Sequence, residues 1–169
     1  MSILIAPLMA AMAFSSPAAA VESDDYTFEH QASVGVHYQQ YDEVDDLDMP
    51  VLSAGYAYQI TTPDKKLSFT PEIRVGVGKT SYRDIDVTLS SLQAAVRMTA
   101  NVNDTVGIFI RPNYTLSKYR IDGGSSPSDS EFGIAYGASI KLNKTLNLDF
   151  SIENFEDSKA YGVGVRIPM

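Results

Sequence analysis

The sequence predicts an all-β fold, an antiparallel up-and-down barrel of eight strands that crosses a membrane. The clearest evidence is the stretch 67–78, LSFTPEIRVGVG, in which apolar residues alternate with polar or small ones. A period of two is that of a β-strand with one apolar and one polar face. The apolar face carries no charge, and the stretch is as long as the roughly 9–11 residues that a tilted strand needs to cross a bilayer. We therefore expect lipid on the apolar side and a polar lumen on the other.

The second observation is repetition, because the same alternation returns along the rest of the chain. A strand in lipid cannot leave its edge unpaired, since its N–H and C=O groups would have no partner there, so the strands must close into a barrel. Eight segments are enough for closure, and an even number is usual for such barrels. The expected strands are 28–40, 52–60, 67–78, 91–102, 106–115, 132–142, 146–153 and 161–169.

The first four segments are separated by signals for loops and turns. The acidic run 42–48 follows the first segment, residues 62–65 form a turn that contains proline, and Asn103-Asp104 makes a tight turn after the fourth. Residues near the middle of these segments that we expect to face lipid are, in order, Val34, Tyr56, Ile73 and Val96.

The last four segments follow the same scheme, with a long Gly- and Ser-rich loop at 122–127 between the fifth and the sixth. Their expected lipid-facing residues include, in order, Ile110, Tyr136, Phe150 and Val163. Pro71 and Pro112 fall inside two segments. Proline donates no hydrogen bond to a ladder, so we expect a local bulge at each of them.

The connections alternate in length, as expected when long loops face outward and short turns face the periplasm. Both termini then lie in the periplasm. The outer connections are 42–50, 79–88, 118–131 and 154–159, and the inner ones are 61–66, 103–105 and 143–145. Aromatic residues near the strand ends predict two girdles, an outer one of Tyr38, Tyr82, Tyr114, Phe132 and Tyr161 and an inner one of Phe28, Tyr58 and Phe69.

Length and composition restrict the remaining choices. A chain of 169 residues is enough for one domain, and it contains no cysteine. Its net charge of −8 argues against nucleic acid as a partner. Residues 1–20 carry no charge and end in Ala18-Ala19-Ala20, which predicts a signal peptide cleaved after Ala20 and a barrel domain at 21–169.

Charged residues on the lumen parity form the main candidate site. They are Glu29, Glu72, Arg74, Arg97, Arg111, Lys141, Asp149, Glu153 and Arg166. Four acids against five bases leave +1, a balance typical of a packed polar network in an interior just wide enough for side chains. A gated proton or ion path is the functional alternative.

No catalytic, cofactor-binding or metal-ligating residues are predicted. His30 and His37 are the only histidines, and no His-x-Ser spacing accompanies them. The carboxylates of 42–48 suit hard cations, but they lack the glycine and ligand spacing of an EF-hand loop, so a solvated loop is the simpler interpretation. Divalent ions bridging this loop to lipopolysaccharide phosphates are the alternative.

The repeated alternation and the chain ending resemble the small eight-stranded outer-membrane proteins, the OmpX and OmpA transmembrane-domain type. The ending is similar to the C-terminal assembly signal of these barrels, although this chain ends in Met where the family usually ends in Phe. The residues that carry this signal are Tyr161, Val163, Val165, Ile167 and Met169.

The resemblance implies a porin-like barrel in the outer membrane of a Gram-negative cell. The implied role is non-enzymatic, in envelope structure or in surface interaction through extracellular loops. The expected partners are outer-membrane lipids and lipopolysaccharide, together with the barrel-assembly machinery during biogenesis, and the expected state is a monomer without cofactors. A lipid A-modifying enzyme and a narrow ion or solute channel are the alternatives, and a soluble lipocalin-like barrel is a distant third.

Overall fold

The computed structural model describes residues 26–41, 48–82, 85–122, 124 and 126–169. The predicted signal peptide and most of the acidic segment 42–48 lie outside these residues. None of the described residues forms a helix long and apolar enough to span a bilayer. The strands are β1 (Thr27–Tyr41), β2 (Asp48–Thr61), β3 (Leu67–Tyr82), β4 (Ile85–Asn101), β5 (Val106–Ile121), β6 (Ser128–Asn143), β7 (Leu146–Asn154) and β8 (Ser158–Pro168).

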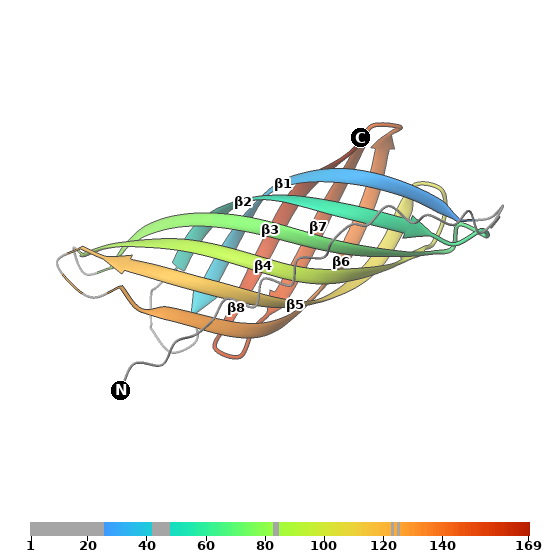
Figure 1. Ribbon diagram of the computed structural model, residues 1–169. Coiled ribbons are helices and arrows are strands. Elements are labelled where there is room, and N and C mark those ends of the chain that lie inside the picture. The colour runs from blue at the N-terminus through green and yellow to red at the C-terminus, as the bar shows by residue number, and fades with distance from the viewer. Residues whose placement is uncertain (1–25, 42–47, 83–84, 123, 125) are drawn as a thin grey trace.

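The strands form a closed antiparallel barrel in chain order (Figure 1). Each strand pairs with the next, and β1 pairs with β8 from Gln31↔Pro168 to Tyr41↔Ser158, which leaves no edge inside the bilayer. The predicted fold class is confirmed.

The two faces of the wall have the predicted chemistry. Ile73 on β3 is 58% exposed on the outside, whereas its neighbour Glu72 is 4% exposed and faces inward. We call the outward apolar surface the lipid belt. It spans 28–38, 52–60, 67–77, 92–102, 106–116, 132–142, 146–152 and 161–167 on successive strands.

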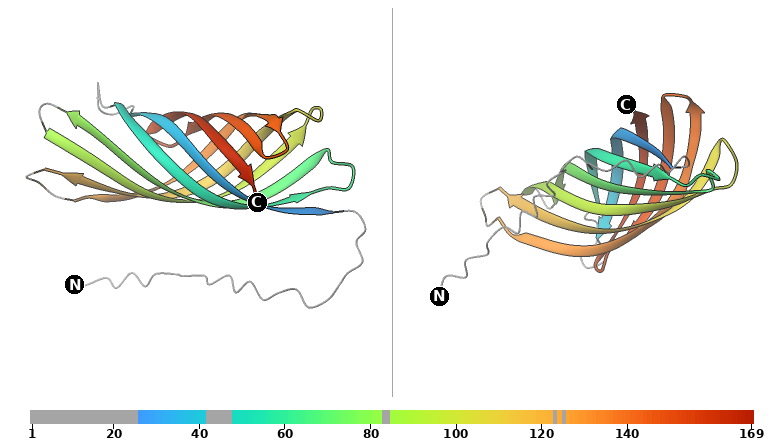
Figure 2. Two further views of the ribbon diagram at one scale, coloured as in Figure 1. Left: turned by 90° about the horizontal axis from the view of Figure 1, so that it is seen from above. Right: turned by 45° about the vertical axis from the view of Figure 1, so that its right-hand side comes forward.

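Two hairpins continue well beyond the lipid belt at the outer end. The predicted loops 79–88 and 118–131 are wrong in extent, because the β3–β4 connection is only 83–84 and the β5–β6 connection is 122–127. Both hairpins project at the left of Figure 1, and Figure 2 shows them from above. Polar side chains on the outward face end the lipid-facing pattern, but a ladder in water needs no apolar outward face, so the strands continue.

The two prolines do not cause bulges, and this expectation is wrong. The register continues unchanged through both, and the shift recorded in the described strands lies between Lys141 and Asn143. Pro71 pairs with β4 while the β2–β3 ladder skips its position, and Pro112 pairs with β6 while the β4–β5 ladder skips its position. A backbone N–H in a strand faces only one neighbour, so each proline interrupts one ladder locally.

Candidate functional site

A cluster of charged side chains fills the middle of the barrel, and Glu72 lies at its centre. Its Oε1 is 3.3 Å from Arg74 Nη2 and 3.3 Å from Arg111 Nη1, and its Oε2 is 3.1 Å from Arg166 Nη2. We call this cluster the charged layer. It consists of Glu72, Arg74, Arg97, Arg111, Asp149, Glu153 and Arg166.

Asp149 joins two of the arginines at the inner side of the charged layer. Arg97 Nη1 lies 2.5 Å and Arg166 Nη2 lies 3.2 Å from Asp149 Oδ2. Ser139 Oγ donates a hydrogen bond to Oδ1 at 2.7 Å. The guanidinium of Arg97 also stacks over Phe109, 3.7 Å from the ring centroid, so its flat face is covered as well.

Glu153 is held by neutral donors as well as by a charge. It accepts hydrogen bonds from Gln93 Nε2 at 2.9 Å, from Asn113 Nδ2 at 2.6 Å and from Arg111 Nη2 at 3.2 Å. Each carboxylate of the charged layer thus meets at least one guanidinium, which is what buried charges require, since an unpaired one is costly. The layer is a dense structural element that crosses the lumen.

Two residues of the predicted polar network lie apart from this cluster. Glu29 is half-buried and is linked indirectly, because Gln31 donates to it at 2.9 Å and accepts from Arg166 Nη1 at 3.2 Å. Lys141 is exposed near the inner end of β6, so it does not belong to the buried layer.

The residues of the proposed C-terminal assembly signal lie on β8 or directly after it, and their side chains lie on the outward face. Tyr161, Val163 and Ile167 are exposed there, and the Met169 N–H donates to His30 O at 2.8 Å. Their role in assembly stays a prediction.

An apolar cluster that sequence reasoning missed lies in the lumen on the outer side of the charged layer. Met49, Val51 and Leu89 are buried, and three partly buried apolar side chains pack against them. We call this cluster the apolar layer, and its members are Tyr41, Met49, Val51, Val87, Leu89 and Tyr119. All lie on inward positions beyond the lipid belt. The sequence signal was that the inward positions continue at every second residue from the strands into the segments interpreted as loops.

Two small cavities lie in and above the charged layer. One of about 50 Å³ is lined by residues that include Arg74, Leu89 and Phe155, and a second of about 20 Å³ lies deeper beside Phe109. Each has room for a few water molecules at most. Neither can hold an acyl chain or provide a continuous path for solute.

A histidine and a serine meet at the boundary between these cavities. His37 Nε2 is 2.9 Å from Ser53 Oγ, and Ser53 in turn donates to Gly35 O at 3.3 Å. His37 Nδ1 has no hydrogen-bond partner among the described residues, so no carboxylate orients the ring. The pair faces the lumen, where both side chains line the two cavities.

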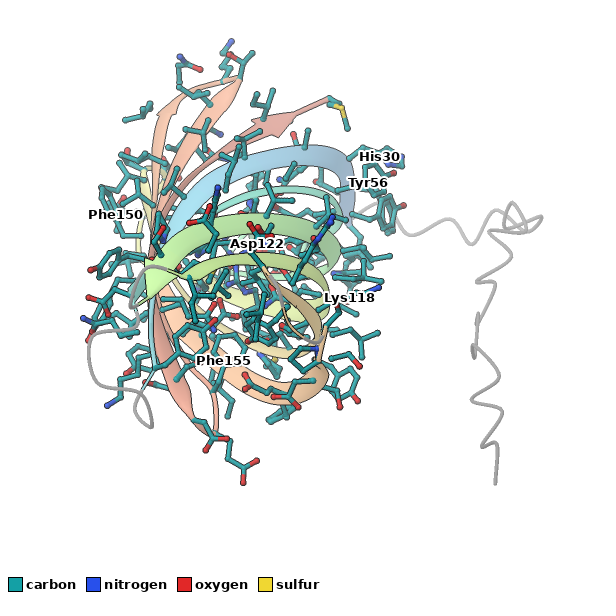
Figure 3. All side chains as sticks on the ribbon, turned by 90° about the vertical axis from the view of Figure 1, so that its left-hand side faces the viewer. His30, Tyr56, Lys118, Asp122, Phe150 and Phe155 are labelled. Atoms are coloured by element: carbon teal, nitrogen blue, oxygen red, sulfur yellow. The ribbon has the colours of Figure 1, made fainter. Side chains whose placement is uncertain are left out.

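His30 lies on the opposite side of the wall. It is exposed, and its Nδ1 is hydrogen-bonded to the hydroxyl of Tyr56 on the outside of the barrel (Figure 3). This contact lies near the periplasmic edge of the lipid belt. With the ring of Tyr58 it forms an aromatic patch, with centroids 5.0 Å apart. No serine accompanies His30 in this contact.

The outer mouth is covered from the β7–β8 side. A Cβ placed on Gly133 would lie 2.7 Å from the ring of Phe155, so glycine is needed for this ring to enter. Glu131 lies beside it, beyond the lipid belt and half-buried. Burial, followed by the nearby carboxylate of Asp129, raises the pKa of Glu131 to about 7.

Comparison with known proteins agrees with this architecture. The family model described as outer membrane protein beta-barrel domain matches residues 6–167. No curated protein matches the sequence. Neisserial surface protein A (NspA) superimposes with a TM-score of 0.57 at 16% identity, covering 84% of this chain and 97% of that one.

Two other solved structures are similar in fold. Ail of Yersinia pestis, solved in complex with the heparin analogue sucrose octasulfate, has a TM-score of 0.55 at 13% identity, with 86% of this chain and 99% of that chain covered. The outer membrane enzyme PagL has a TM-score of 0.51 at 13% identity, with 82% and 99% covered. The expected resemblance is confirmed: the chain belongs to the outer-membrane protein β-barrel domain family and resides in the cell outer membrane.

Proposed function

We propose that this barrel is a non-enzymatic surface protein that binds its partners at the outer end of strands β3 to β6. The four strands extend past the lipid belt as a sheet, which we call the outer sheet. It comprises 79–82, 85–90, 117–121 and 128–131.

The observation that carries this proposal is the pairing at the two edges of the outer sheet. The β2–β3 ladder runs outward only to Val51↔Gly78, and the β6–β7 ladder begins only at Ile134↔Asn154. Beyond these pairs, one side of β3 and one side of β6 have no ladder partner among the described residues. Unpaired N–H and C=O groups of an exposed strand attract an incoming strand, which is a common way to bind an extended peptide.

The interior supports a non-enzymatic role. The charged and apolar layers occupy the lumen in succession, and the two cavities in and above the charged layer have room for only a few waters. His37 and Ser53 meet inside the wall, out of reach of lipid. The complex of Ail with a heparin analogue is a property of Ail, and it supports the idea that a barrel of this shape can serve as a binding scaffold.

The proposal is tested by shortening both hairpins of the outer sheet to Gly-Asn turns, replacing 79–88 and 118–131. The full-length and trimmed barrels are produced in a non-adherent Gram-negative host, and cells retained on epithelial monolayers and on polystyrene are counted. We expect the trimmed barrel to keep its heat-dependent shift in gel mobility but to lose retention.

Two further measurements would contradict the proposal. One is a stable planar-bilayer conductance that survives trimming and changes in Arg97→Ala, which would make the lumen the working part. The other is a change in lipid A mass on production of the protein that disappears in Ser53→Ala, which would indicate an enzyme.

A further inference from the structure

The outer edge of the lipid belt has an unusual charge distribution. The first outward position beyond the belt on the eight strands is occupied, in order, by Gln40, Pro50, Lys79, Ser90, Lys118, Ser130, Asn154 and Lys159. Three are lysines and none is acidic, although the chain has 21 acidic residues against 13 basic ones. This ring of eight outward positions thus carries no carboxylate, although the protein as a whole is acidic.

The inner edge of the belt lacks this segregation. The positions that continue the outward parity there include Asp104 as well as Lys65 and Lys144, so both signs are present. The difference between the two edges indicates that the outer one meets negative charge.

Two of the three lysines form part of a compact group on adjacent strands. Lys118 on β5 is the cross-strand partner of Ser90 on β4. One position further out, Thr88 pairs with both Lys79 and Arg120. Directly opposite residues on one sheet face have Cβ atoms about 4.5–5.5 Å apart, so these side chains share one small surface. We call it the basic patch: Lys79, Thr88, Ser90, Lys118 and Arg120.

The cations of the basic patch differ in how far they are already neutralised. Lys79 Nζ lies 2.6 Å from Asp86 Oδ2. Neither Lys118 nor Arg120 has an acidic group within 4.0 Å in the described part of the chain. Figure 3 looks onto this end of the barrel and labels Lys118. Two cations and two hydroxyls are therefore available to an external anion.

We propose that the basic patch binds the phosphate group of an outer-leaflet lipid. Val77, Leu92 and Leu116 end the belt directly beneath the patch and would contact acyl chains. The long Lys and Arg side chains reach along this apolar surface while their charged ends stay at the headgroup level. Charge-assisted hydrogen bonds to phosphate are among the stronger polar contacts, and the hydroxyls of Thr88 and Ser90 add neutral donors.

Continuity with the belt favours a lipid over free phosphate, which has the same chemistry but gains nothing from the apolar surface. This site is independent of the proposed partner-binding role, because it uses the outward face of the outer sheet and leaves both edges open. A wild-type barrel that adheres to cells but retains no phosphorylated lipid A would overturn only the present proposal.

The test compares the wild type with Lys118→Glu/Arg120→Glu, and with Lys65→Glu/Lys66→Glu as a control of equal charge change on a periplasmic turn. Each barrel is refolded in phosphatidylcholine vesicles containing lipid A with its phosphates or dephosphorylated lipid A. After detergent extraction and size exclusion, the lipid A retained per barrel is counted by native mass spectrometry.

We expect the patch variant to retain about tenfold less phosphorylated lipid A than the wild type, because two favourable surface charges become unfavourable. The control should retain the wild-type amount, and dephosphorylated lipid A should be retained by none of the three. If the patch variant fails the heat-shift test of folding, Lys118→Gln/Arg120→Gln replaces it.

Three results would overturn the proposal. Equal loss in the control would mean that overall charge is responsible. Equal retention of dephosphorylated lipid A by the wild type would mean that phosphate is not recognised. Displacement of lipid A by excess inorganic phosphate would mean that the patch is a free-anion site.

Discussion

The charged layer and the apolar layer are built on the same inward positions of the barrel, yet their chemistry is opposite. On β4, Arg97 belongs to the first and Leu89 to the second. The charged layer lies within the height of the lipid belt, whereas the apolar layer lies beyond it, toward external water. Excluding water strengthens ion pairs in a low-dielectric interior. We therefore expect the apolar layer to limit the access of external water to the outer side of the charged layer.

The most severe change is expected at the centre of the charged layer. Glu72→Gln would leave Arg74, Arg111 and Arg166 without their shared carboxylate, and breaking a buried ion cluster costs about 3–5 kcal/mol. Guanidinium-induced unfolding from phosphatidylcholine vesicles measures this loss. The exposed Lys141→Gln serves as the control, expected within about 0.5 kcal/mol of the wild type. Similar effects for both variants would show that the layer does not hold the barrel together.

Leu89→Ala tests the apolar layer. Leu89 is 2% exposed, and truncating a buried leucine typically costs about 2–5 kcal/mol. If the apolar layer also excludes water, amide hydrogens on the strand segments that carry the charged layer should exchange faster in this variant. If Leu89→Ala destabilises the barrel but leaves amide exchange around the charged layer unchanged, the apolar layer contributes packing only and does not exclude water.

Ile73→Arg tests the outer face of the wall next to Glu72. An arginine facing lipid near the bilayer midplane costs about 2–4 kcal/mol. Ile73→Val is the matched control and should change the free energy of unfolding little, because valine is also an apolar side chain suited to a lipid-facing position. The same unfolding assay applies, and a neutral Ile73→Arg would invert the assignment of the two faces.

The smallest effect is expected at Glu131, beside the apolar layer. Its folded pKa of about 7 lies above the ordinary value of 4.5 for a glutamate, so protonation favours the folded state. Its contribution to stability is full below pH 4.5 and is lost as the pH rises through about 7. Glu131→Gln should therefore be more stable than the wild type above pH 7, by no more than about 1 kcal/mol because the group is half exposed. If the difference in free energy of unfolding between Glu131→Gln and the wild type is the same at pH 5 and at pH 8, the raised pKa of Glu131 is contradicted.

The extent of the strands could be predicted only where lipid selects the residues. Inside the belt, lipid excludes polar side chains from one face, so the period of two appears in the sequence and marks strand and orientation together. At 79–82 and 117–121 the outward face meets water instead of lipid, so the selection for apolar outward residues ends while the ladder continues. The bulges expected at Pro71 and Pro112 were wrong for a related reason. The sequence does not show which neighbouring strand the missing N–H of a proline would have faced.

The sequence by itself determined the class of protein: β-strands with one lipid face, a polar lumen and enough segments for closure. These are local properties, because the direction of a side chain alternates along every strand. Which lumen residues meet was decided only by the tertiary structure. Glu72 and Arg166 are 94 residues apart, and Met49 on β2 packs in one cluster with Leu89 on β4, although β3 lies between their strands. Register and closure set such contacts, and they depend on backbone pairing along whole strands, which the residues at either position do not encode.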